Sequence, residues 1–204
     1  MPQEDSVDTI KALPQPQKDL PFPLMKALEH RRTTRTWTDD AVSEQDLSNL
    51  LWAACGITVR ATRTGKQKRT APSAANCQEI RLFVALPEGL YEYDEANHAL
   101  LLRMNKDIRD SIGTQKMMKS APVGIIFVSD YSRMKTYLAK DDVRKWFVSG
   151  TDAGFISQNI YLYCAAANLS TAVLGLVDRE ELGRLLGLCP HEKVVYTQVV
   201  GNAR

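Results

Sequence analysis

Residues 150–168 restrict the fold of this 204-residue chain most, because they predict a helix with almost no polar face. Phe155 and Ile156 open the apolar part, and the run from Ile160 to Ala167 is made of apolar, tyrosine, cysteine and alanine residues. A helix that is apolar all round must be buried on all sides. We therefore expect it at the centre of the fold or against a second subunit, and we predict a dimer.

The other elements predict a mixed α+β fold without internal repeats. Helices are expected from Leu24 to Arg31, after Ser43 up to Gly56, over residues 105–119 and after Asp178. Strands are expected over residues 80–86, 89–94, 98–102, 123–128, 171–177 and 194–200, and a polar loop over residues 58–70. Residues 1–22 predict an extended N-terminal arm, and residues 23–204 predict one domain.

Composition excludes several classes of protein. With 44% hydrophobic and 25% charged residues the chain is an ordinary globular one, and a net charge of +2 argues against nucleic acid as a partner. No run reaches the ~20 apolar residues of a membrane span, and residues 1–20 lack the apolar core of a signal peptide. We expect no membrane partner and a cytoplasmic location, or a periplasmic one if an export leader precedes this sequence.

The cysteines and histidines predict no metal site. Cys55, Cys77, Cys164 and Cys189 contain no CxxC pair, and the three histidines contain no HExxH motif. We interpret the cysteines as reduced thiols, mostly buried.

The segment Arg31–Trp37 places three arginines and three threonines within six residues. Guanidinium groups bind phosphate oxygens two at a time, and short hydroxyl donors can complete such a clamp. A cationic helix end in solvent is an equally good interpretation of this segment alone. Five more basic residues lie between Arg60 and Arg69, which favours a local anion site.

Residues 69–78 form a second polar constellation around Pro72. Small residues here let a flat ligand approach the backbone, and Ser73, Asn76 and Gln78 can hydrogen-bond to the edge of a ring. A plain helix start, with Ser73 as cap and the two amides in solvent, is the simpler interpretation of this stretch alone.

Several cofactor and catalytic motifs are missing from the sequence. It has no GxGxxG, no GxxxxGK[ST] and no GxSxG motif. A bound phosphate would therefore be held by side chains, and hydrolase activity is disfavoured.

Four stretches in this order, RRTTRTW, APSAANCQ, DAGFISQNIYLYCAAANL and VVGNAR, resemble the nitroreductase family of FMN-dependent oxidoreductases. The resemblance covers residues 23–204 and is greatest to the short bacterial members. It implies a central, mostly antiparallel sheet flanked by helices. It also implies an interleaved homodimer with FMN at the subunit interface.

The resemblance further implies which residues bind FMN. Its phosphate and ribityl chain would contact Arg31, Arg32, Thr33 and Arg35, with Arg204 as a late phosphate ligand. Pro72, Ser73, Ala74 and Asn76 of the partner subunit would border the isoalloxazine ring, Gln115 would meet its pyrimidine edge, and Val173, Leu174 and Gly175 would pass near its N5. Cys77 and the ending Gly201–Arg204 depart from the family pattern, which affects Arg204 and the substrate opening.

The implied activity is hydride transfer from NADH or NADPH through flavin N5 to a nitroaromatic, a quinone or another conjugated small-molecule acceptor. No side chain is required as a general acid or base, so we assign no catalytic residue. Two other classes stay open: a flavin store or sensor with little turnover, and an anion- or RNA-binding module built on residues 31–69. The RNA module is disfavoured because no stacking aromatics alternate with its charges.

Overall fold

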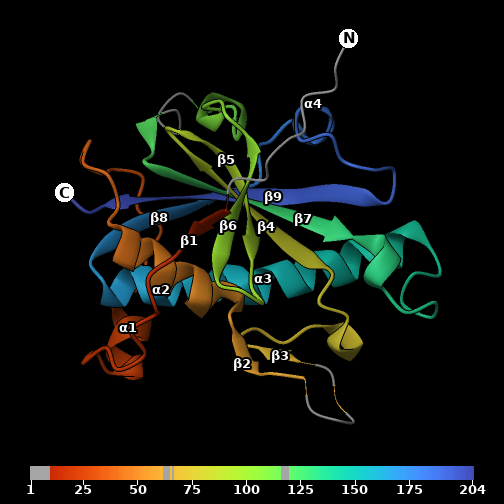
Figure 1. The fold of residues 1–204 in the computed structure, drawn as a ribbon, viewed down its shortest axis with the longest axis horizontal. Coiled ribbons are helices and arrows are strands. Elements are labelled where there is room, and N and C mark those ends of the chain that lie inside the picture. Colours follow the sequence, from red (N-terminus) through yellow and green to blue (C-terminus); the bar gives the residue numbers. More distant parts are fainter. Residues whose placement is uncertain (1–9, 62–64, 66, 116–119) are drawn as a thin grey trace.

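A computed structural model of the protein describes residues 10–61, 65, 67–115 and 120–204. Its centre is a seven-stranded sheet in the order β1-β6-β5-β4-β7-β9-β8, in which every neighbouring pair is antiparallel (Figure 1). The strands are β1 (Ile10–Ala12), β4 (Ile80–Leu86), β5 (Gly89–Asp94), β6 (Ala99–Met104), β7 (Val123–Asp130), β8 (Leu169–Leu174) and β9 (Glu192–Asn202).

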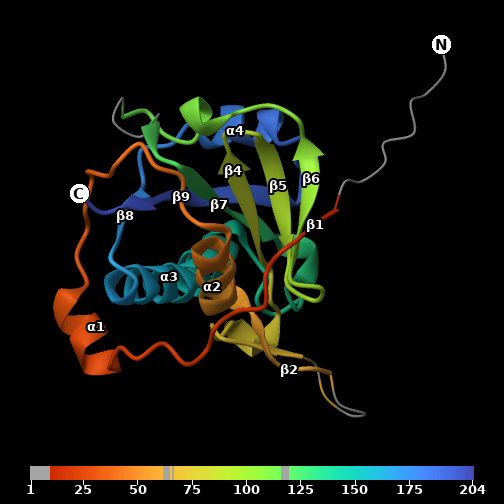
Figure 2. The same ribbon diagram turned by 60° about the vertical axis from the view of Figure 1, so that its left-hand side comes forward.

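Helices cover both faces of this sheet. The helices α2 (Glu44–Cys55) and α3 (Asp142–Ala166) lie on one face, α4 (Arg179–Leu185) lies on the other, and α1 (Leu24–His30) lies beside the C-terminal part of α3 (Figure 2). The predicted α+β class, with a mostly antiparallel sheet flanked by helices, is confirmed. Of the helices described, none combines the length and the apolar character that crossing a membrane requires.

The central strands are apolar on both sides because each side faces helices. In β4, Ile80, Leu82 and Val84 belong to the core under α2 and α3. The alternate residues Phe83 and Ala85 belong to the core on the α4 side. Successive side chains of a strand point to opposite faces, so one apolar run supplies both cores.

Two predicted helix starts are confirmed by their capping contacts. The Ser43 Oγ accepts a hydrogen bond from the Asp46 N–H at the start of α2, and the Asp178 carboxylate accepts one from the Glu181 N–H at the start of α4. After α4, Gly187 has a φ of +65°, the left-handed conformation that favours glycine at a helix end.

Residues 10–22 of the predicted arm lie against the sheet and α2, and residues 1–9 fall outside the described part of the chain. Its β1 pairs with β6 at the edge of the sheet. The Pro14 carbonyl accepts a hydrogen bond from Ser48 at 2.6 Å, and the Gln17 N–H donates to Asn49 at 2.7 Å, both residues of α2. These contacts fix an extended path from the sheet edge to α1.

The apolar helix is longer and less enclosed than the sequence predicts. It begins at Asp142, capped by Asp141, eight residues before the expected start. Within one chain it is not buried on all sides, since Phe155 is 44% exposed and Phe147 is 73% exposed. The residues before the expected start include polar side chains and the exposed ring of Phe147. The apolar pattern therefore did not show that the helix begins at Asp142.

The helix expected over residues 105–119 is wrong for the part that the structure describes. Residues 105–115 contain only a 3₁₀ turn, Arg109–Ser111. Ile108 and Ile112 are buried in the core on the α4 side, and a Cβ on Gly113 would meet Leu174 at 2.8 Å. Tertiary packing overrides the helical pattern here; residues 116–119 lie outside the described part.

Two further boundaries differ from the prediction. Residues 58–70 are not only loop, because β2 (Ile57–Val59) and β3 (Lys68–Arg69) form a small antiparallel hairpin. The strand expected over residues 171–177 runs from Leu169 to Leu174. It ends at Leu174 because the next carbonyl, that of Gly175, accepts hydrogen bonds from the Val177 N–H and from Arg179 instead of from β9.

Candidate functional site

The arginine-rich segment after α1 is extended and attached to the end of the sheet. The Thr34 N–H donates to the Thr171 carbonyl of β8, and the Thr38 N–H donates to the Asn202 carbonyl of β9, both at 3.0 Å. Trp37 is buried against Gly201, where a Cβ would approach the tryptophan Cβ to 2.7 Å. Because side chains of an extended segment alternate, residues 31–36 present two different faces.

One face meets Tyr161 of α3. The Tyr161 hydroxyl lies 3.0 Å from the Thr33 Oγ1 and accepts a hydrogen bond from the Val173 N–H at 3.1 Å. The Arg31 guanidinium lies 5.5 Å from the centre of the tyrosine ring, a cation–π distance. Tyr161 thus joins the arginine segment to the segment Val173–Gly175, and Arg35 follows on the same face by alternation.

The other face lines a pocket of about 330 Å³. Arg32, Thr34 and Thr36 meet Arg204 there, and the lining contains no carboxylate; it also includes His30, Cys164, Ala165, Asn168, Leu169, Ser170 and Ala203. The Ser170 Oγ is buried and has no hydrogen-bond partner in the described part of the chain. Cationic and hydroxyl donors without acids fit an anion such as a phosphate.

The arginines of both faces are available to a ligand. Among the residues described, the guanidinium of Arg32 contacts the His30 carbonyl, that of Arg204 contacts the Trp37 carbonyl, and that of Arg31 contacts a tyrosine ring. None of these contacts neutralises the positive charge. The segment is thus a cationic surface held in shape by the sheet.

Gln115 directly follows Thr114, a residue that is hydrogen-bonded next to the Val173–Gly175 segment. The backbone N–H and the hydroxyl of the preceding residue, Thr114, both donate to the Leu176 carbonyl at 3.3 Å. Leu174 is 2% exposed, so it presents only its backbone to a ligand. Gly175 is exposed, and a Cβ there would meet nothing within 4 Å.

The turn around Pro72 is held by its own side-chain hydrogen bonds and is not a plain helix start. Ala74–Asn76 form a 3₁₀ turn, and Ser73 does not cap it; its Oγ accepts a hydrogen bond from the Gln78 N–H at 3.0 Å. Asn76 and Gln78 bond to each other and to the Gln67 carbonyl. The simpler interpretation, with these amides in solvent, is wrong.

This turn is separated from the arginine segment within one chain. The Ala74 N–H donates to Asp152 of α3 at 2.8 Å, whereas Thr33 contacts Tyr161 of the same helix. Nine residues separate these two helix positions, which is about 14 Å along the axis. Figure 1 shows α1 and the turn below different parts of α3. The predicted residues therefore form three groups: both faces of residues 31–36, the Gln115 and Val173–Gly175 group, and the distant turn.

The sequence analysis overlooked Tyr161, Asp152 and Glu79. In the sequence, Tyr161 and Asp152 differ from their neighbours only as polar groups within the most apolar helix. Buried polar groups need hydrogen-bond partners, and here only the folded structure shows which residues these are. Glu79 is fully buried directly before β4, and its carboxyl oxygens accept no hydrogen bond from an N–H or hydroxyl group among the described residues. Burial, followed by the charge of Asp152, raises the pKa of Glu79 to about 8, and burial also raises the pKa of Asp152.

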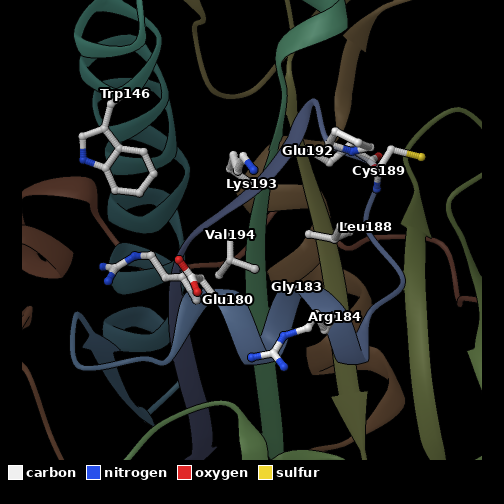
Figure 3. A pocket seen from close by; sticks show the side chains of 11 residues that line it. Trp146, Glu180, Gly183, Arg184, Leu188, Cys189, Glu192, Lys193 and Val194 are labelled. Carbon is white, nitrogen blue, oxygen red and sulfur yellow. The ribbon is translucent and has the colours of Figure 1, made fainter.

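A larger pocket of about 580 Å³ lies between α4, the start of α3 and the start of β9 (Figure 3). Arg179 lies between this pocket and the predicted site, since it donates to the Gly175 carbonyl at 3.2 Å. The lining carries both signs of charge: Arg179, Arg184 and Lys193 against Glu180 and Glu192. This mixture favours no particular ligand charge.

Asp130, His191 and Glu192 lie close enough together to hold a metal ion, a grouping that the sequence pattern did not indicate. Their carboxylates are already engaged. Asp130 accepts from Ser132 and Arg133, and Glu192 pairs with Arg81. We interpret the cluster as part of an ion-pair network.

The fold and the cationic segment define a class: an α+β protein with an antiparallel sheet whose edge offers arginines and hydroxyls to an anionic ligand. The model of the Nitroreductase family matches residues 28–202. The chain therefore belongs to the nitroreductase family, and its general class is that of the flavin oxidoreductases.

Individual relatives agree with this assignment. The crystal structure of a nitroreductase-like protein from Ralstonia eutropha JMP134 is 34% identical, with a TM-score of 0.86, covering 98% of this chain and 92% of that one. A nitroreductase-like protein of Methanocaldococcus jannaschii is 22% identical over 173 residues, 80% of this chain and 83% of that protein. A nitroreductase-like protein from Desulfovibrio desulfuricans, solved in complex with FMN, is 23% identical with a TM-score of 0.62, covering 89% of this chain and 86% of that one.

Proposed function

We propose that this protein is an FMN-dependent oxidoreductase that uses NADH or NADPH to reduce a nitroaromatic, a quinone or another conjugated acceptor in a ping-pong reaction. One observation carries the proposal: the Tyr161 hydroxyl bonds to both Thr33 and Val173. A phosphate-binding segment and an open backbone segment thus share one face. The FMN bound to the Desulfovibrio relative supports the choice of flavin.

The arginine segment would hold the phosphate end of FMN. Arg31 and Thr33 contact Tyr161, and alternation puts Arg35 on the same face. Charge-assisted hydrogen bonds from guanidinium groups suit phosphate oxygens. Arg32 and Arg204 add positive charge from the pocket side. Tyr161 orients this segment relative to β8.

The segment Val173, Leu174 and Gly175 would lie along the isoalloxazine ring, with Gln115 at its pyrimidine edge. The absence of a side chain at Gly175 leaves room for a flat ring, since a Cβ there would meet no atom within 4 Å. Bound FMN supplies hydride acceptance and donation at N5. The protein orients the ring and supplies donors around it, and we assign no side chain as general acid or base.

A second copy of the chain would complete the site as a homodimer. Pro72, Ser73, Ala74 and Asn76 lie about 14 Å along α3 from the arginine segment of their own chain, as the helical rise gives. Large apolar side chains are exposed on α3 and α1: Val143, Phe147, Phe155, Leu24, Met25 and Leu28. Exposed apolar surface of this kind favours burial against a partner. We infer that the partner's turn reaches the ring.

Removal of Arg31 tests the phosphate assignment. The Arg31→Ala variant is expected to lose about tenfold or more in FMN affinity, since a hydrogen bond to a charged group is worth about 1.5–3 kcal/mol. FMN affinity is measured by quenching of flavin fluorescence, after release and identification of the flavin that copurifies with the unmodified protein. Arg35→Ala should behave alike.

The matched control is Arg184→Ala, an arginine of α4 whose side chain is 73% exposed and lies outside the proposed FMN site. It removes the same charge from a distant position and should retain the affinity. Full flavin occupancy in both the Arg31 and the Arg35 variant would reject the phosphate assignment.

A further inference from the structure

Glu79 has an environment that an ionised carboxylate does not tolerate. It is 0% exposed, and neither carboxyl oxygen meets a hydrogen-bond donor among the described residues. A charge taken out of water without a partner is strongly disfavoured, and such a group keeps its proton instead. Glu79 is therefore a neutral carboxylic acid at neutral pH, with a proton to donate.

Asp152 of α3 is the acceptor for that proton. It is 2% exposed, and a hydrogen bond between the two carboxyl groups accompanies the raised pKa of Glu79. The second contact of Asp152 is the Ala74 N–H, which donates to its Oδ2 at 2.8 Å. Two buried carboxyl groups joined by a hydrogen bond share one proton, because a second negative charge would be repelled by the first.

The contact to Ala74 matters because the turn is strained. Ala75, Asn76 and Gln78 have φ values of 50°, 53° and 53°, in the left-handed region that residues other than glycine rarely adopt. Such backbone persists only where surrounding contacts impose it. Ser73 bonds to the Gln78 N–H from within the turn, whereas Asp152 holds the turn from α3.

Among the described residues, the neighbouring cation is already paired with another carboxylate. The Arg69 guanidinium of β3 pairs with Glu95 at 2.8 Å and donates to the Ile80 carbonyl, and only its buried Nε–H has no hydrogen-bond partner. Other groups on the surrounding elements are committed or neutral: Asp130 of β7 bonds to Ser132 and Arg133, Arg133 also donates to the Gln78 carbonyl, and burial raises the pKa of Cys55 of α2 and Tyr93 of β5.

We propose that Glu79 and Asp152 form a one-proton carboxyl pair that holds residues 73–78 in the shape that borders the flavin, which makes Glu79 a positioning residue. This inference rests on the proposed function. Loss of the proton places two anions side by side, and their repulsion withdraws Asp152 from Ala74. The turn then relaxes, and FMN affinity falls.

The direction of the pH dependence follows from proton linkage. Glu79 has its raised pKa, about 8, only while the turn is closed. Above this pH the Glu79 carboxyl has lost its proton while the turn is relaxed, so closing the turn requires Glu79 to take a proton up from solution. FMN affinity should therefore be constant on the acid side of pH 8 and fall by up to about tenfold per pH unit above it.

The test compares FMN affinity between pH 6.5 and pH 9.5 in the unmodified protein and in Glu79→Gln. Glutamine keeps the shape and a neutral donor to Asp152 but cannot ionise. Its affinity at pH 7 should lie within about threefold of the unmodified protein, and the fall above pH 8 should disappear. Titration of FMN itself affects both proteins equally.

Glu88→Gln is the matched control, because Glu88 follows β4 as Glu79 precedes it, but is exposed. It should retain the alkaline fall. A fall that persists in Glu79→Gln, or an unmodified protein whose FMN affinity does not change with pH, would overturn the positioning role.

A readout without FMN separates this inference from the proposed function. Infrared spectra of the flavin-free protein at pH 7 should show a protonated carboxyl band that is missing from Glu79→Gln. Absence of the band overturns the carboxyl pair whatever FMN does. Failure to bind FMN at any pH overturns the proposed function together with the positioning role, whereas pH-independent FMN binding overturns the positioning role alone.

Discussion

At the scale of residues, a single hydroxyl joins segments that are 140 positions apart in the sequence. Tyr161 is half-buried, and its oxygen contacts Thr33 and the Val173 N–H. Both contacts keep the arginine segment and the proposed flavin segment in register. An apolar helix needs no hydroxyl for packing at this position, so the oxygen points to a role in holding the site.

Removal of that oxygen should weaken FMN binding without unfolding the protein. Tyr161→Phe keeps the ring and its cation–π contact with Arg31, but it removes hydrogen bonds worth about 0.5–1.5 kcal/mol each. We expect FMN affinity to fall about threefold to tenfold, measured by flavin fluorescence. Tyr137→Phe, a change at a tyrosine that is 57% exposed, is the control and should bind normally. Equal affinity in all three proteins would refute the role of Tyr161.

At the scale of elements, local patterns predicted what local chemistry decides. The strand Ile80–Leu86 and the helix after Ser43 begin and end as predicted, because a continuous apolar run and a capping hydroxyl can be recognised from neighbouring residues. Residues 105–115 were mispredicted because Gly113 and Ile112 pack against residues that are distant in the sequence. The four site motifs could be recognised in sequence, but their division into separate groups, and the roles of Tyr161 and Asp152, depend on packing along α3.

The exposed face of α3 carries a prediction of its own. Phe147 is 73% exposed and Val143 is 81% exposed, and both lie one helical turn apart on the same side. In a dimer these side chains become buried, so Phe147→Asp should place a charge in the interface and produce monomers. The molar mass is measured by light scattering after gel filtration. Tyr137→Asp, an equally drastic change outside α3, should leave a dimer; a monomeric unmodified protein with bound flavin would contradict the interface.

At the scale of the whole molecule, the sheet and α3 act as a frame that separates the binding groups. The sheet end fixes the arginine segment, α3 carries Tyr161 near one end and Asp152 nearer the other, and the turn around Ser73 is bonded to the latter. A flavin held by the first group would be bordered by the turn only if a second chain presents it. We therefore propose that α3 links flavin binding, ring orientation and dimer assembly.

The central claim is that the protein uses bound FMN for turnover. Its most direct test is an anaerobic titration of the FMN-loaded protein with NADH or NADPH, followed by an acceptor such as a quinone or a nitroaromatic compound. We predict that one of the two nicotinamide cofactors bleaches the flavin absorbance and that the acceptor restores it. A bound flavin that stays oxidised with both would contradict the account and indicate a flavin store or sensor instead.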